Sequence, residues 1–225
     1  MERLSQRNKH RILRHHLVLA LVCGASLFTL YSVGHSASVK FRCSIATGYV
    51  GLALLGATLV TGALNVLRNR RSPVSTDLRR DIGIWCGSIS LAHVVIGLQV
   101  HLGNMLLYFF REAGKSKRLV PRSDLFGFAN YTGLIATLIV VLLLALSNDA
   151  SLRALGKKRW KFLQRWNYAV MVLVVLHITA YQILERRQLQ YLFLSSVIIG
   201  TALIVQVSGF RRQKRKAAEL SQQTR

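Results

Sequence analysis

Residues 166–184 read WNYAVMVLVVLHITAYQIL, a run without a charged side chain that contains one histidine, His177. At 1.5 Å per residue, a helix of this length crosses the roughly 30 Å hydrocarbon core of a bilayer. A second long apolar run, 82–110, contains His93 and His101. Ionisable side chains are expensive in hydrocarbon, so histidines in such runs are functional candidates.

Four further apolar runs of comparable length indicate a polytopic membrane protein. The expected spans are 17–34, 44–67, 82–110, 128–147, 166–184 and 189–210. The mean hydropathy is +0.34, yet 31 Lys and Arg stand against 8 Asp and Glu. Such composition fits apolar spans separated by charged loops. We therefore predict an all-α, six-helix transmembrane bundle over 17–210, flanked by basic tails at 1–16 and 211–225.

The distribution of charge predicts the orientation. The two tails and the loops at 68–80 and 153–165 together hold 22 of the 31 basic residues, which places them and both termini in the cytoplasm. The loop at 111–127 carries five basic residues and opposes this assignment. Because the charge is divided among short segments beside membrane ends, we exclude nucleic acid as a partner and expect contact with membrane lipid.

The two principal histidines are predicted to lie at one depth. His93 follows Arg80 by 13 residues and His177 follows Arg165 by 12, about 20 Å and 18 Å along their helices. Both spans run in the same direction, so the imidazoles face each other beyond the midplane. Such a pair is the usual axial arrangement of a b-type haem. Alternatively, each histidine only hydrogen-bonds a neighbouring helix in a haem-free scaffold or transporter component.

The other histidines are assigned simpler roles. His101 lies further out, at the level of Glu185 and Arg186, and is expected to make an interfacial contact. The remaining four lie in polar segments and are predicted to be solvated: His10, His15, His16 and His35. The three cysteines have no paired spacing, so neither a disulfide framework nor a zinc or iron–sulfur site is expected.

Two stretches resemble the ferric reductase-like transmembrane domain, and within it the haem-binding membrane subunits of bacterial periplasmic methionine sulfoxide reductases. The first is LRRDIGI at 78–84, followed by His93. The second runs from 147 to 168, with SN, LGKKRW and LQR before Tyr168 and His177. The resemblance implies a six-helix bundle that moves single electrons across the bacterial inner membrane, with His93 and His177 as axial ligands of haem b.

The chain departs from that family at the inner haem position. Members commonly have a histidine where this chain has Gln164, and one branch has another near the position of Arg79. We therefore expect one haem, with a flavin or a quinone bridging the inner half of the membrane. Its expected contacts are Arg79, Arg80, Trp160, Arg165 and Trp166, which could instead hold haem propionates.

The resemblance also implies separate redox partners. This chain would be the electron-transfer subunit of an oxidoreductase system. The donor would be a separate cytoplasmic flavin reductase or a quinol. The acceptor on the outer face would be a partner oxidoreductase, ferric iron or dioxygen.

Overall fold

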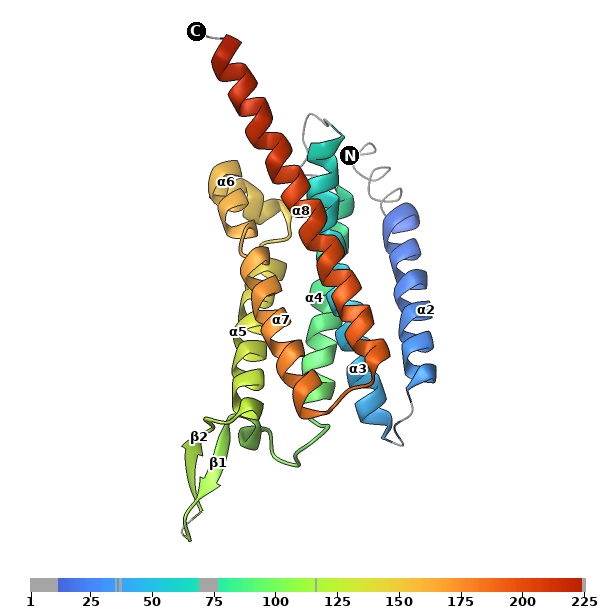
Figure 1. Cartoon of the computed structure of the whole chain (residues 1–225), viewed down its shortest axis with the longest axis vertical. Coiled ribbons are helices and arrows are strands. Elements are labelled where there is room, and N and C mark those ends of the chain that lie inside the picture. The colour runs from blue at the N-terminus through green and yellow to red at the C-terminus, as the bar shows by residue number, and fades with distance from the viewer. Residues whose placement is uncertain (1–11, 35, 37, 69–76, 116, 224–225) are drawn as a thin grey trace.

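The computed structural model describes residues 12–34, 36, 38–68, 77–115 and 117–223, and these are mostly helical (Figure 1). A short π-helix, η1 (Ile12–His16), leads into the first long helix. The α-helices are α2 (Leu17–Val33), α3 (Val39–Leu67), α4 (Asp77–Gly97), α5 (Leu125–Ala145), α6 (Asp149–Gln164), α7 (Asn167–Leu184) and α8 (Leu189–Gln223). The predicted all-α membrane fold is confirmed.

Five helical segments among the described residues are long and apolar enough to cross a membrane. They are α2 extended back to Leu13, α3, α5, the α6–α7 segment, and α8 as far as Glu219. Helix α4 is not among them; its first turns contain Asp77, Arg79, Arg80 and Asp81. It nevertheless lies beside α3 and α5 within the bundle (Figure 1). Six spanning helices therefore remain a prediction.

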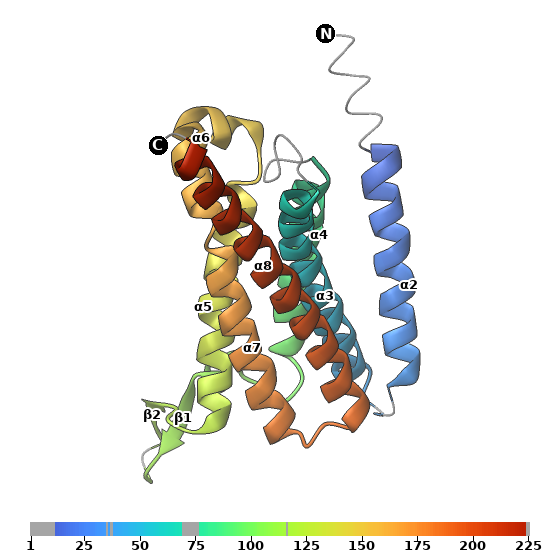
Figure 2. The same ribbon diagram turned by 45° about the horizontal axis from the view of Figure 1, so that its top comes forward.

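The helices form one bundle whose centre lies between α3, α4, α5 and α7. Helix α3 packs against α4 and α8, α5 packs against α7, and α2 contacts α3 at the periphery (Figures 1 and 2). Tyr49 and Val170 are almost fully buried in the core. Large apolar side chains such as Phe28, Phe193 and Ile204 are instead exposed on the outer helices. Exposed apolar surface of this extent fits contact with lipid chains.

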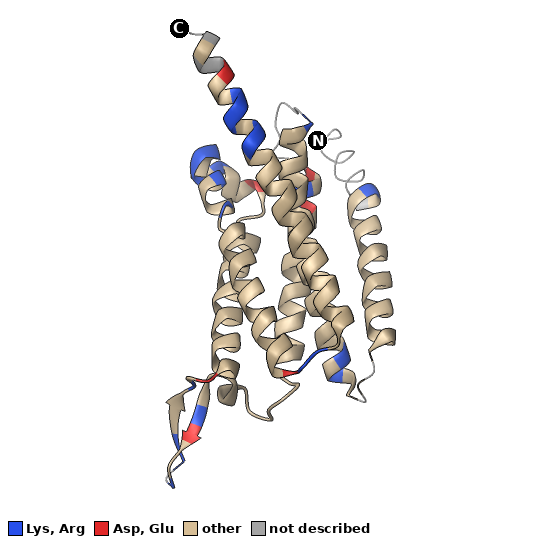
Figure 3. Ribbon diagram, in the orientation of Figure 1, with Lys and Arg blue, Asp and Glu red and all other residues tan. Residues whose placement is uncertain are grey.

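Charged residues lie at the two ends of the bundle, while its middle has almost none (Figure 3). At the end that we call the basic end, α2 begins, α8 ends, and α6 carries Lys157, Lys158, Arg159 and Lys161. The opposite end, the hairpin end, holds the C-termini of α4 and α7. Placing the basic end in the cytoplasm remains a prediction. The helical structure is continuous across both predicted domain boundaries. Helix η1 continues directly into α2, and α8 extends beyond residue 210.

The predicted third span, 82–110, is wrong over its second half, because α4 ends at Gly97. The buried Tyr108 hydroxyl donates to the Gly97 carbonyl at 3.0 Å and accepts from the amides of His101 and Leu102 at 2.9 and 3.3 Å. One side chain therefore satisfies the amides of His101 and Leu102 and adds a second donor to the Gly97 carbonyl, which also accepts from the Val100 amide at 3.1 Å. A 3₁₀ helix, η2 (Met105–Tyr108), follows.

Beyond η2 the chain forms an antiparallel hairpin of β1 (Phe110–Ala113) and β2 (Arg118–Pro121) (Figure 1). The apolar content of 98–110 suggested a continuous helix, but Gly97, Gly103 and Asn104 interrupt it. Helix α5 then starts cleanly, because the Asp124 side chain accepts from the Gly127 amide at 2.8 Å.

Two histidines predicted to be solvated instead fasten the N-terminal segment to α4. His15 Nδ1 lies 2.7 Å from Oδ2 of Asp81, and His16 Nε2 lies 3.5 Å from Oδ1 of the same carboxylate. The Trp85 indole donates to His16 Nδ1 at 3.2 Å. Asp81 is fully buried, so these contacts satisfy a carboxylate that would be costly to bury without partners. His10 and His35 lie outside the described residues.

Candidate functional site

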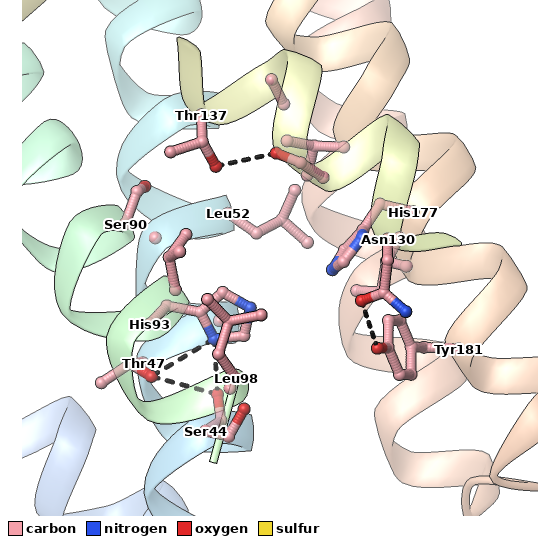
Figure 4. A pocket seen from close by; sticks show the side chains of 18 of the residues that line it. Ser44, Thr47, Leu52, Ser90, His93, Leu98, Asn130, Thr137, His177 and Tyr181 are labelled. Atoms are coloured by element: carbon pink, nitrogen blue, oxygen red, sulfur yellow. Dashed lines mark hydrogen bonds between the residues drawn. The ribbon is translucent and has the colours of Figure 1, made fainter. Parts of the chain in front are cut away.

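The structure brings together His93 on α4 and His177 on α7, the pair that the sequence placed at one depth. Their ring centroids are 6.3 Å apart, and the ring planes are nearly perpendicular, at 89° (Figure 4). Imidazole nitrogens bind first-row metals at about 2.0–2.1 Å, so two rings on opposite sides of one ion have centroids roughly 6 Å apart. At the observed separation, His93 and His177 would be able to hold a single metal ion between them.

Each imidazole is oriented by a backbone carbonyl of a neighbouring helix. His93 Nδ1 lies 2.9 Å from the Ser44 carbonyl oxygen on α3, with Thr47 Oγ1 at 3.4 Å. His177 Nδ1 lies 2.8 Å from the Ala129 carbonyl oxygen on α5. Because a carbonyl oxygen can only accept, both Nδ1 atoms carry the proton. The Nε2 lone pair of each ring is then the one available to a metal, as in ligating histidines generally.

Two glycines allow the neighbouring helices to approach these rings. A Cβ atom at Gly48 on α3 would lie 3.0 Å from Cε1 of His93. A Cβ atom at Gly133 on α5 would lie 2.8 Å from Nδ1 of His177. Side chains at either position would push the imidazole out of place. Gly133 carries no signal in the sequence, because its role depends on the His177 side chain of the neighbouring helix.

The two histidines line one cavity of about 250 Å³, which extends toward the hairpin end. Small and apolar side chains dominate its middle: Gly48, Gly51, Leu52, Ser90, Gly133, Ala136, Thr137, Val140, Val170 and Val174. Cys86, Ser90 and Gly97 of α4 also line the cavity, as does Tyr181 of α7. A narrow apolar space with two available imidazole nitrogens matches the chemistry of a flat, iron-containing macrocycle.

A polar cluster lies at the hairpin-end mouth of this cavity. His101 Nε2 is 3.0 Å from Oε1 of Glu185, and Arg187 Nε donates to Oε2 of Glu185 at 2.7 Å. The His101 ring stacks on Tyr181, which packs against His177. The interfacial contact predicted for His101 is present. The sequence did not indicate a role for Arg187, because its contact with Glu185 depends on how the chain folds after α7.

The charge of Glu185 is stabilised within this cluster. Burial raises the pKa of Glu185, but the hydrogen bonds and charges of His101 and Arg187 outweigh burial and leave its pKa below the ordinary value. Glu185 therefore stays ionised at neutral pH. The mouth thus combines a fixed carboxylate, a guanidinium and an imidazole.

A second, smaller cavity of about 80 Å³ lies toward the basic end and is lined by three of the five residues expected there. Arg79 donates to the Thr58 carbonyl, Arg80 to the Ser147 carbonyl, and the Trp160 indole to the Leu146 carbonyl. The other two expected residues, Arg165 and Trp166, are exposed and do not line it.

Gln164, where the family resemblance led us to expect a histidine, also lines this second cavity. Its buried Nε2 has no hydrogen-bond partner among the described residues. A primary amide is a poor iron ligand, because its nitrogen offers no basic lone pair. The donor set therefore suits a metal at His93 and His177 but not at Gln164.

The chain matches one family model and several known proteins. Residues 47–175 match the model of the ferric reductase-like transmembrane component, a stretch that includes His93 and ends two residues before His177. Three relatives share the description "Protein-methionine-sulfoxide reductase heme-binding subunit MsrQ". The Klebsiella pneumoniae protein is 27% identical over 156 residues, which cover 68% of this chain and 71% of the relative.

Two further relatives are similar over a shorter region. The Cronobacter sakazakii protein is 31% identical over 132 residues, covering 58% of this chain and 59% of the relative. The Yersinia pseudotuberculosis serotype O:1b protein is 30% identical over 132 residues, covering 58% of each chain. The family match spans more than half of the chain and contains most of the described bundle. The chain therefore belongs to the ferric reductase-like transmembrane family.

Proposed function

We propose that this protein is a membrane b-type cytochrome that passes single electrons through one haem held by His93 and His177. The observation that carries the proposal is the pair of imidazoles, 6.3 Å apart, whose Nδ1 atoms are both engaged by backbone carbonyls. The names of the relatives, which describe haem-binding subunits, support the same cofactor.

A bound haem b would supply one-electron chemistry at its iron. The residues of this chain would hold and shield it. Ser44 and Ala129 fix the tautomer and the direction of the two imidazoles, so each presents Nε2 to the cavity. Leu52, Val140 and Val174 exclude water from the cavity. A dry site limits competing reactions and sets the dielectric that tunes the reduction potential.

The proposed orientation places the basic end in the cytoplasm and the hairpin end on the outer face of a bacterial inner membrane. The cavity opens toward the hairpin end, which suits electron delivery to an acceptor there. The names of the relatives favour a protein-methionine-sulfoxide reductase as that acceptor, over ferric iron or dioxygen. The donor would be a separate cytoplasmic flavin reductase or a membrane quinol.

A second carrier would bridge the half of the membrane nearer the basic end. The 80 Å³ cavity beside Arg79, Arg80 and Trp160 is the proposed place for the ring or phosphate of a flavin, or for a quinone. Arg165 and Trp166 would contact it only at the rim. Quantifying flavin and quinone in gently extracted protein tests this bridge, and finding neither would contradict it.

Spectroscopy of the overexpressed protein in membranes tests the haem itself. The wild type should give a reduced-minus-oxidised b-type spectrum that disappears in both His93→Ala and His177→Ala. His101→Ala should keep the spectrum, because its imidazole is committed to Glu185. Unchanged spectra in both ligand variants would remove the assignment. A colourless wild type that inserts normally would favour the alternative, a haem-free scaffold or transporter component.

A further inference from the structure

The hairpin at residues 110–121 carries a concentrated positive charge at the end of the bundle opposite the basic end (Figure 3). Arg111, Lys115, Lys117 and Arg118 stand against a single acid, Glu112. All four cations are exposed. Lys117 lies 4.0 Å from Glu112, a loose contact that leaves most of the positive charge uncompensated.

Strand register puts both arginines on one face. Arg111 pairs with Val120, and Arg118 pairs with Ala113. Residues opposite each other in a ladder share a face, and so do residues two apart on one strand. Arg111 and Arg118 therefore point the same way, as diagonal neighbours. The lysines at the turn extend this surface toward the tip.

The base of the hairpin is firmly tied to the bundle. The Arg122 amide donates to the Phe109 carbonyl at 2.9 Å, and its guanidinium donates to the Leu107 carbonyl at 3.1 Å. The Tyr131 hydroxyl on α5 donates to the Phe109 carbonyl at 2.5 Å. A surface held in one conformation before binding loses little entropy when it binds.

The same base leads directly to the cavity of the two histidines. Phe109, the residue before β1, lines that cavity, and so does Tyr108. A protein seated on the hairpin would therefore lie at the same end of the bundle as the cavity mouth, which is lined by His101, Glu185 and Arg187.

Control of membrane topology does not account for these cations. Under the orientation proposed above, the hairpin lies on the outer face, where positive residues oppose the usual bias. The hairpin also projects away from the helix ends rather than lying against their sides (Figures 1 and 2). This direction favours a soluble partner over lipid headgroups.

We propose that the face and tip of this hairpin form the docking surface for an acidic patch on the soluble electron acceptor. The inference rests on the proposed function and specifies where the acceptor binds. Complementary charge steers encounter and fixes the register of two proteins more than it adds final affinity. The docking surface consists of Arg111, Lys115, Lys117 and Arg118.

The test compares two matched variants in zwitterionic phosphatidylcholine nanodiscs. The hairpin variant replaces Arg111, Lys115, Lys117 and Arg118 with Gln. The control replaces four exposed cations of α6 with Gln: Lys157, Lys158, Arg159 and Lys161. The probe is a purified soluble methionine sulfoxide reductase from the same organism. Binding to each nanodisc and oxidation of the chemically reduced protein are measured at low and high salt.

The hairpin variant should associate about tenfold more slowly than wild type at roughly 20 mM salt, and the difference should nearly vanish at about 0.5 M. The α6 control should match wild type, and both should keep the wild-type haem spectrum. Equal association of hairpin variant and wild type overturns the proposal. Binding that requires added phosphatidylglycerol also overturns it, since lipid would then be the ligand.

The two proposals can fail separately. If the wild type carries no haem but still binds the probe through the hairpin cations, the proposed function fails and the docking surface stands. If the haem is present and reducible but the wild type shows no salt-dependent binding, the docking surface fails and the cytochrome assignment stands.

Discussion

At the scale of single residues, the site depends on how two imidazoles are aimed. The carbonyls of Ser44 and Ala129 each accept a hydrogen bond from Nδ1, which leaves Nε2 of each ring available, and both histidines line one cavity. The sequence predicted both histidines but not these acceptors. A backbone carbonyl is present at every position, so its role is visible only once the helices are packed.

The glycines that lie against the two histidine rings provide the first prediction, at the residue scale. Gly133→Ala should displace His177, because the new Cβ would lie 2.8 Å from Nδ1. Overpacking of this kind costs about 1–3 kcal/mol, so haem occupancy should fall roughly tenfold. Gly48→Ala should reduce haem occupancy less, because the closest contact of its Cβ, to Cε1 of His93, is 3.0 Å. Haem per protein, measured as the pyridine haemochrome, checks the order.

A matched glycine on α2 serves as the control. A Cβ at Gly24 meets no atom within 4 Å, so Gly24→Ala should leave haem content at the wild-type level. Equal haem content in all three variants would show that the close approach of α5 to His177 is not required.

At the scale of elements, the connection between α4 and α5 sets the hairpin end of the site. The Tyr108 hydroxyl donates to the carbonyl of Gly97, the last residue of α4. The hairpin follows, and Asp124 then caps the start of α5. Asp124 also pairs with Arg122, whose Nη2 lies 2.7 Å from Oδ2. The Arg122 hydrogen bond, with help from the Gly127 amide, holds the pKa of Asp124 below its ordinary value.

The Asp124 carboxylate provides a pH-dependent prediction at this scale. Because the pKa of Asp124 is lower in the folded state than in the unfolded state, its ionised form stabilises the fold above the unfolded-state pKa of about 3.9. This stabilisation is lost as the pH falls through the lower pKa of the folded state. Asp124→Asn keeps the cap but removes the charge. Its apparent Tm should be lower than that of the wild type at pH 7, and the difference should shrink as the pH falls below the ordinary Asp pKa of about 3.9.

The size of this effect should be modest. Asp124 is partly exposed, so loss of its charge should cost less than about 1 kcal/mol, no more than roughly 2–4 °C in a chain of this size. Asp124→Ala also removes the cap and should cost about 1 kcal/mol more at every pH. A gap between the Tm values of wild type and Asp124→Asn that stays constant as the pH falls below about 3.9 would contradict the charge-based account.

At the scale of the whole molecule, helices α4 and α7 run in the same direction (Figure 1). Each of them packs against both α3 and α5. This arrangement puts both histidines at one level and places the basic α6 and the hairpin at opposite ends. The direction of electron flow that we propose depends on which end faces the cytoplasm.

Cysteine labelling provides the prediction at this scale. In intact cells, a membrane-impermeant maleimide should label Lys115→Cys in the hairpin but not Lys158→Cys in α6. Both should react after the membrane is permeabilised. The wild type sets the background, with Cys23 and Cys86 buried and Cys43 partly buried. The reverse pattern would invert the proposed orientation and place the docking surface in the cytoplasm.

The sequence alone determined the membrane class, most helix positions and the two histidines at one depth. These features follow from run length, local charge and residue counting along a helix, which need no knowledge of neighbours. Only the tertiary structure decided that α4 stops at Gly97, which carbonyls orient the imidazoles, and that His15 and His16 pair with Asp81. Such contacts join segments far apart in the chain, and packing in three dimensions selects them.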